Sequence, residues 1–210
     1  KNQFHDVEFI DDSKCIQWEW FPNLPAIPPA PILAVMLGVT LHAPFSYLYH
    51  WKCASILPPG LPRLTDWSRR MDHAMIHVAS TFLSYATSGR WDYLLVNALF
   101  NADCIYRQFQ EKIRPRQNQI RLLLSIIGYT LPILIAGDFY LYLLCWIVIC
   151  SSMFFFIRYP VGGWSHSVFH IILAFLPPCI MYAAANLPIS QDHMEMAAKC
   201  SKFGEKLAHS

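Results

Sequence analysis

The residues best suited to chemistry in this sequence are histidines spaced four positions apart. His166 and His170 form an HxxxH pair, and His42, Ser46 and His50 also recur every four residues. Residues at this spacing share one face of a helix, so two imidazole nitrogens can bind one metal ion at about 2.0–2.1 Å. The alternatives are interior histidines hydrogen-bonded to neighbouring helices and, for His50, an interfacial side chain among aromatic neighbours.

A carboxylate, Asp72, begins another segment of the chain. Taken alone, it could pair with the neighbouring arginines at a membrane surface. His50 ends a segment that is expected to cross a membrane toward the cytoplasm. Asp72, His166 and His170 begin segments that are expected to cross it in the opposite direction. Three imidazoles, a hydroxyl and a carboxylate are thereby expected at one depth on three helices, and this grouping predicts a metal site.

Three neutral imidazoles that leave one position open are typical of catalytic zinc, whereas a closed structural site more often recruits cysteine. The fourth ligand would be water, whose pKa zinc lowers to about 7. Ser46 could hydrogen-bond this water or a developing oxyanion, and Asp72 could orient the water and move its proton. The sequence thus predicts metal-ligand roles for His50, His166 and His170 and catalytic roles for Ser46 and Asp72.

The elements that must position these residues are apolar. Of the 210 residues, 55% are hydrophobic and 14% are charged, against about 25% charged in soluble domains. The net charge of +2 is spread over short clusters, which argues against a nucleic-acid partner. The seven cysteines include no CxxC pair and four of them lie in apolar runs, so no disulfide framework is predicted.

Six apolar segments predict an all-α, polytopic membrane helix bundle of about six transmembrane helices, each needing about 20 apolar residues to cross the bilayer, although hydropathy alone would not identify the second and third. The second and third spans carry several polar side chains, which should face the bundle interior because unpaired polar groups are costly in lipid. A polar N-terminal segment (1–25) precedes the bundle (26–187), and a polar C-terminal tail (188–210) follows it. The predicted spans lie near residues 27–50, 71–88, 91–107, 119–137, 138–157 and 164–187.

Basic residues between the spans indicate the orientation of the bundle. The more basic side should be cytoplasmic, which places the zinc site near the cytoplasmic face and both termini outside the cell or in an organelle lumen. The basic residues on this side are Lys52, Arg63, Arg69, Arg70, Arg107, Lys112, Arg114, Arg116, Arg121 and Arg158.

Together these motifs resemble those of the CREST superfamily, which groups alkaline ceramidases, progestin and adiponectin receptors and haemolysin-III-like proteins. The matching patches are Ser46 to His50, Arg69 to Ile76 with Asp72 inside it, and His166 to His170, and the resemblance runs from about residue 30 to 187. It implies a seven-helix bundle that holds zinc through the three histidines, with the Ser and Asp beside the metal-bound water.

Two features depart from the family pattern. Family members carry a helix before the Ser-His span, whereas here only a polar segment precedes it, so we expect a truncated chain or a six-helix variant. In addition, the stretch from Ser80 to Tyr85 stands where haemolysin-III-like proteins have a Gly-Thr-Tyr-Thr-Pro-like sequence. His42, His73 and His77 are extra to the pattern and are interpreted as packing groups or as groups around the ligands.

The sequence therefore predicts a zinc-dependent integral membrane hydrolase that cleaves a lipid amide or ester, with metal-bound water as the nucleophile and a membrane lipid as the substrate. The first alternative is a receptor or signalling protein of the progestin and adiponectin receptor type with structural or weakly hydrolytic zinc. The others are a membrane protein whose histidines bind nothing and a haem protein with histidines on facing helices.

Overall fold

The fold comes from a computed structural model that describes residues 27–58, 60–110 and 114–208. The predicted N-terminal segment 1–25 lies outside these described residues. The described part of the chain is all-α, as predicted. Its elements are α1 (Ala30–Ser55), α2 (Leu61–Thr65), α3 (Trp67–Ser88), α4 (Trp91–Gln108), α5 (Pro115–Ile135), α6 (Phe139–Arg158), the 3₁₀ turn η3 (Gly162–Trp164), α7 (Ser165–Leu173), α8 (Leu176–Ala185) and α9 (Pro188–Ala208).

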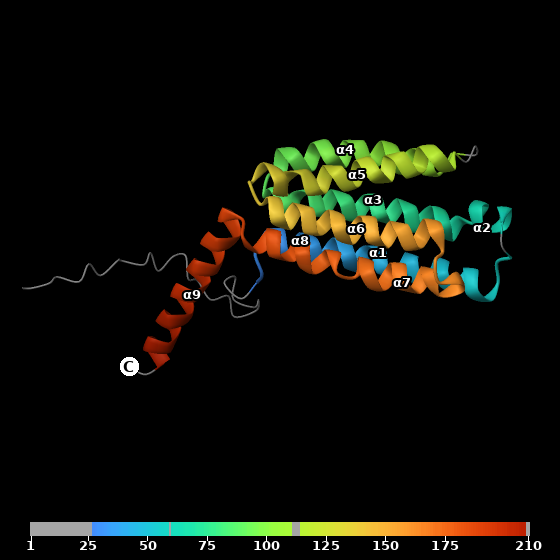
Figure 1. The fold of residues 1–210 in the computed structure, drawn as a ribbon. Helices are drawn as coiled ribbons and strands as arrows, with labels where there is room; N and C mark the ends of the chain where they lie inside the picture. Colours follow the sequence, from blue (N-terminus) through green and yellow to red (C-terminus); the bar gives the residue numbers. More distant parts are fainter. Residues whose placement is uncertain (1–26, 59, 111–113, 209–210) are drawn as a thin grey trace, which may run out of the picture.

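The long helices form a polytopic bundle whose elements lie side by side (Figure 1). Within the described residues, four helices are long and apolar enough to cross a membrane: α1, α5, α6 and the continuous stretch Ser165–Ala185. That stretch corresponds to the sixth predicted span, but it is divided into α7 and α8. The division follows from Pro177 and Pro178, which lack the N–H groups that would bond back to the preceding turn.

Helix α3 lies at the centre of the bundle, packed against α1, α4, α5 and α8 (Figure 1). Its polar side chains Asp72, His77, Ser80 and Ser84 are buried. Because neighbouring helices cover α3 on several sides, it does not need the apolar surface that a lipid-facing helix requires. Its low hydropathy therefore reflects a central position in the bundle.

The apolar core joins α1, α3, α5, α6 and α8. Its fully buried side chains include Val35, Ala86, Cys145 and Ile180. Large apolar side chains also remain exposed on the outward faces of the helices, for example Ile135 at 73%. A bundle that is apolar inside and outside suits a hydrocarbon solvent, because soluble proteins rarely expose contiguous apolar patches of this kind.

The two ends of the bundle differ. One end carries α2, the end of α1 and the beginnings of α3 and α7, whereas the opposite end carries α9, which is tilted away from the bundle (Figure 1). Gly89 and Gly137, with φ of 64° and 87°, close the turns after α3 and α5 at that opposite end. These left-handed conformations favour glycine, and the short turns make the joined helices antiparallel.

The prediction of no disulfide was wrong at one position, because Cys200 in α9 is disulfide-bonded. The prediction rested on the lack of closely spaced cysteine pairs in the sequence. Disulfide formation requires only that two thiols meet in space, with Cα atoms usually about 4.4–6.8 Å apart. The spacing of cysteines along the sequence is therefore a poor guide to whether a given cysteine is bridged.

Candidate metal centre

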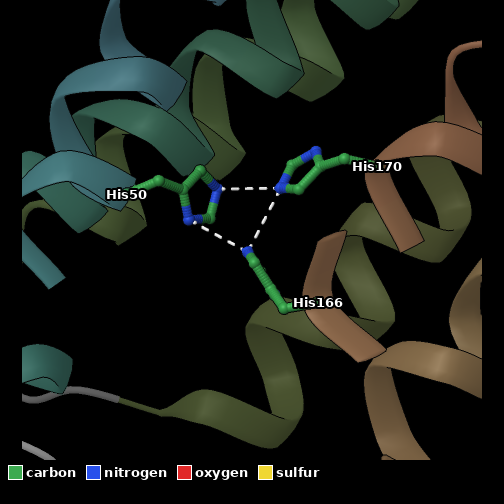
Figure 2. A group of neighbouring side chains, drawn as sticks. All are labelled: His50, His166 and His170. Atoms are coloured by element: carbon green, nitrogen blue, oxygen red, sulfur yellow. Dashed lines mark hydrogen bonds between the residues drawn. The ribbon is translucent and has the colours of Figure 1, made fainter. Parts of the chain in front are cut away.

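Three imidazole rings meet at the α2 end of the bundle. His50 lies near the end of α1, and His166 and His170 lie on consecutive turns at the start of α7 (Figure 2). His166 Nε2 is 3.0 Å from His50 Nδ1, His170 Nε2 is 3.1 Å from His50 Nε2, and the two Nε2 atoms are 3.2 Å apart. Nitrogens bound to one tetrahedral zinc ion are about 3.3 Å apart, so this cluster has the dimensions of a metal site.

Hydrogen bonds alone cannot account for all three nitrogen-to-nitrogen contacts. In its ring plane a neutral imidazole nitrogen has either one hydrogen or one lone pair, so it serves one partner. The Nε2 atoms of His166 and His170 each face two nitrogens. Hydrogen bonds among three neutral rings can therefore complete at most two of the three contacts, whereas a cation can receive a lone pair from every ring.

One nitrogen from each ring can be chosen so that all three lie within 4.8 Å of one another. His50 turns its Nδ1 toward His166 and its Nε2 toward His170. A bound ion would take one of these two nitrogens, and a rotation of the His50 ring would bring that atom into line. The three-histidine cluster can thus hold a metal ion.

Aromatic rings surround the half-buried cluster. The ring centroids of Phe156 and His166 are 6.0 Å apart, those of Phe169 and His170 are 4.7 Å apart, and Tyr49 is 5.1 Å from His50. Such an apolar shell controls the access of water to a metal and lowers the local dielectric. Because these rings come from α1, α6 and α7, the cluster is enclosed by the same helices that carry or adjoin it.

The end of α1 that carries His50 is tied to the start of α3. Arg63 donates hydrogen bonds to the carbonyls of Leu57 at 3.0 Å and Cys53 at 2.8 Å, which satisfies free carbonyl groups at the end of α1. Lys52 Nζ donates to both carboxylate oxygens of Asp66, at 2.8 and 2.9 Å, and Asp66 caps α3. His50 is therefore held in a fixed position relative to α3.

The contacts of Asp66 with Lys52 and Ser68 also change the pKa of its carboxyl group. Burial acts to raise the pKa of the Asp66 carboxyl, but hydrogen bonds from Lys52 and Ser68 outweigh burial and hold that pKa below its ordinary value. The carboxylate is therefore stabilised in its charged form at neutral pH. It provides an anionic anchor between the two helices.

Asp72 and Ser46 lie at one depth along the antiparallel pair α1 and α3. Gly38 is opposite Ala79, where an added Cβ would lie 3.2 Å from the Ala79 carbonyl oxygen, and Lys52 is opposite Asp66. Midway between these two contacts, Asp72 falls at the level of Ser46. Both residues are thus about one helical turn deeper in the bundle than His50.

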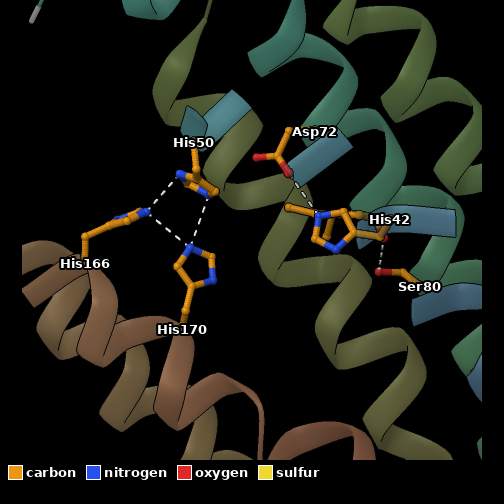
Figure 3. A network of polar contacts seen from close by, with 7 residues as sticks. His42, His50, Asp72, Ser80, His166 and His170 are labelled. Carbon is orange, nitrogen blue, oxygen red and sulfur yellow. Dashed lines mark hydrogen bonds and ion pairs between the residues drawn. The ribbon is translucent and has the colours of Figure 1, made fainter. Parts of the chain in front are cut away.

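The buried Asp72 carboxylate points toward α1. Its Oδ1 is 3.0 Å from His42 Nε2. In Figure 3, the Asp72 carboxylate lies between His42 and His50. In the part of the chain that the structure describes, Asp72 pairs with His42 and not with the adjacent arginines.

Ser46 is half-buried on α1, one turn before His50. Among the described residues its hydroxyl has no hydrogen-bond partner, so it remains available to bind a ligand. The structure therefore brings the three histidines together and places Ser46 and Asp72 one turn away. The catalytic roles of Ser46 and Asp72 stay predictions.

His73 and His77, which are extra to the family pattern, lie elsewhere on α3. His77 is buried against Asn101 of α4 and Ser125 of α5, which fits its interpretation as a packing group. Nδ1 of His73 is buried without a hydrogen-bond partner in the described residues. Sequence reasoning did not identify the His42–Asp72 pair, although the spacing of His42, Ser46 and His50 already indicated that His42 shares their face of α1.

Comparisons of the chain with models of known families, with curated proteins and with solved structures found no match. The geometry of the three histidines and the chemistry of their ligand atoms therefore support the metal centre.

Proposed function

We propose that this protein is a zinc-dependent membrane hydrolase that cleaves a lipid amide or ester. The convergence of the His50, His166 and His170 nitrogens at 3.0–3.2 Å carries the proposal. Three neutral nitrogen donors fit zinc and leave a fourth position open. Zinc bound there would act as a Lewis acid and lower the pKa of a bound water to about 7.

Asp72 and Ser46 would handle the proton and the developing charge. In this proposal the Asp72 carboxylate accepts a proton from the attacking water while the water oxygen bonds to the carbonyl carbon. The Ser46 hydroxyl donates a hydrogen bond to the carbonyl oxygen as negative charge develops there. Asp72 then returns the proton to the leaving amine or alcohol as the C–N or C–O bond breaks, and the products are a fatty acid and that amine or alcohol.

A lipid substrate is supported by the surroundings of the site. The cluster is half-buried among aromatic rings at one end of a bundle whose outer faces are apolar. A molecule dissolved in the bilayer reaches such a site more readily than one dissolved in water. The labile bond of an amide or ester lipid lies near the headgroups, at the depth expected for the end of a bundle.

We propose further that α3 and α4 cross the membrane beside the four apolar spans, which gives six crossings. Both helices run alongside those spans within the same bundle (Figure 1). The six crossings would correspond to helices of a CREST-like bundle. This assignment rests on the Ser-His, Asp and His-His motifs and on the three-histidine cluster that two of them form.

Two observations support an orientation with the metal centre near the cytoplasmic face. The α2 end of the bundle holds most of the basic residues, including Lys52, Arg63 and Arg158, and such ends are usually cytoplasmic. Cys200, in α9 at the opposite end, is disulfide-bonded, and disulfides persist in oxidising compartments. The C-terminus would then lie outside the cell or in a lumen.

The test is to purify the protein in detergent with zinc and supply ceramides and phospholipids separately. We expect release of fatty acid from at least one class, and its disappearance in Asp72→Ala while the zinc content stays unchanged. Bound zinc without any release would favour the receptor alternative. A zinc content below about a tenth of an equivalent in well-folded protein would refute the metal centre.

A further inference from the structure

His42 lies two helical turns before His50 on α1. It contacts Asp72 on the side that faces away from His50. His42 Nε2 is 3.0 Å from Asp72 Oδ1, and the side chains are 28% and 9% exposed. His42 belongs to none of the three motif patches, and the proposed hydrolysis gives it no role. Its contact with a residue in the proposed catalytic machinery therefore calls for an explanation.

The contact joins two helices whose separation is fixed on both sides of it. On one side Gly38 allows α1 to approach the backbone of α3 at Ala79. On the other, Lys52 binds Asp66. Between these two contacts the helices cannot separate easily, so the bond from His42 to Asp72 has a defined length and direction.

A hydrogen bond at this place would fix the orientation of the carboxylate. An aspartate side chain rotates about two torsions, and rotation about the second exchanges the directions of its two oxygens. An N–H group of His42 that donates to Oδ1 holds that oxygen on the side away from the cluster. Oδ2 is then directed to the side of His50, as the view in Figure 3 shows.

We propose that His42 is a positioning residue for Asp72: its Nε2–H holds Oδ1 of the buried carboxylate so that Oδ2 faces the three-histidine cluster. The inference rests on the proposed hydrolase function. His42 touches neither the ion nor the substrate and acts only through Asp72. Groups that orient catalytic side chains around a metal site typically change activity by about 10- to 100-fold when they are replaced.

The first test compares three single variants for zinc content, kcat and KM. His42→Leu removes the donor, and we expect kcat to fall about 10- to 100-fold with KM and zinc content unchanged. His42→Gln keeps an N–H donor at similar reach and should recover most of the lost rate. Thr40→Val, at the same depth on an exposed position of α1, is the control and should match the wild type.

The second test asks whether His42 acts through Asp72. In an Asp72→Ala background, His42→Leu should cause no further loss of residual activity. The thermal midpoints of the two single variants and the double variant, measured in detergent, report the contact without requiring turnover. Here we expect the two shifts to be less than additive, because each substitution removes the same interaction.

The outcomes separate the inference from the proposed function. Wild-type kcat in His42→Leu, or loss of zinc from it, would overturn the positioning role while leaving the hydrolase intact. Additive midpoint shifts would overturn the pairing itself. A zinc-loaded wild type that releases no fatty acid from any lipid would overturn the hydrolase and with it any catalytic role for the pair, even if the midpoint shifts were not additive.

Discussion

Two polar clusters of this protein contain histidine, and the partners of the histidines determine whether each cluster could bind a metal ion. At the α2 end, His50 faces two other imidazoles and every contact joins nitrogen to nitrogen. In the interior, His77 Nδ1 lies 2.8 Å from Asn101 Oδ1 and 2.9 Å from Ser125 Oγ. The amide oxygen offers two lone pairs, and it accepts from both the imidazole and the hydroxyl.

The interior cluster therefore needs no ion. Asn101 also donates its amide N–H to the Asn97 carbonyl, so the side chain uses both its acceptor and its donor group. His77, Asn101 and Ser125 are at most 2% exposed, which leaves no route for a substrate. The cluster at the α2 end is only half-buried and has more nitrogen contacts than its protons can satisfy, so it suits a metal ion.

The largest effect should follow from removing one imidazole of the metal cluster. We expect His166→Ala and His170→Ala each to lose most of the bound zinc and to melt at a lower temperature, since the energy of ligation is partly folding energy. Elemental analysis and thermal melting in detergent provide the measurements. His77→Leu is the matched histidine control and should retain its zinc; full zinc content in both alanine variants would argue strongly against the site.

Ser46→Ala should separate chemistry from metal binding. Because the hydroxyl is expected to stabilise developing charge, turnover should fall about 100- to 1,000-fold, with no change in zinc content. Initial rates of fatty-acid release and elemental analysis of the same preparation test this. A variant that loses its metal would show that Ser46 acts as part of the ligand set.

Chelation should show whether the three-histidine cluster holds a metal ion in the wild-type protein. Removing the metal from wild-type protein is expected to lower its thermal midpoint by several degrees, since a ligand that binds only the folded state stabilises it. His50→Ala, which lacks one ligand, should show little response to the same chelator. Readdition of zinc should restore the wild-type midpoint, and equal responses in both proteins would contradict the assignment.

Breaking the interior cluster should cost stability alone. Asn101→Ala leaves the buried His77 and Ser125 without their shared acceptor, at a cost of about 1–3 kcal/mol. Zinc content should be unchanged. Leu99→Ala on the exposed face of the same helix is the control for truncation, and a comparable loss of stability in that variant would remove the special role of the interior cluster.

The smallest effect should come from the pH dependence of the stability that the ion pair between Lys52 and Asp66 provides beside the metal cluster. The folded-state pKa of Asp66 is below its ordinary value, so the stability from this carboxylate is present above about pH 4 and is lost as pH falls through the folded pKa. The difference in thermal midpoint between wild type and Asp66→Asn should therefore shrink below about pH 4. Asp92→Asn removes an exposed carboxylate and should change little at any pH; a difference that grows on acidification would contradict this interpretation.

The sequence by itself determined the helices and the motif positions. Apolar runs of about 20 residues predicted the four spans. The expectation that polar residues of two further segments face the interior is confirmed for Asp72 and Asn101, which are buried, but it is wrong for Asp103, which is exposed and pairs with Arg107 one turn along α4. The spacing of His166 and His170 put both rings on one helical face. These features are local, since they depend on the period of the helix and on the solvent around it.

Only the tertiary structure decided which side chains meet. It showed that His42, and no arginine in the described part of the chain, pairs with Asp72, that His77 joins an amide and a hydroxyl, and that His50 turns a different nitrogen toward each partner. Each contact depends on the rotation and relative shift of two packed helices. A displacement of one residue turns a side chain by about 100° around its helix axis, so hydropathy and spacing along one helix do not specify such contacts.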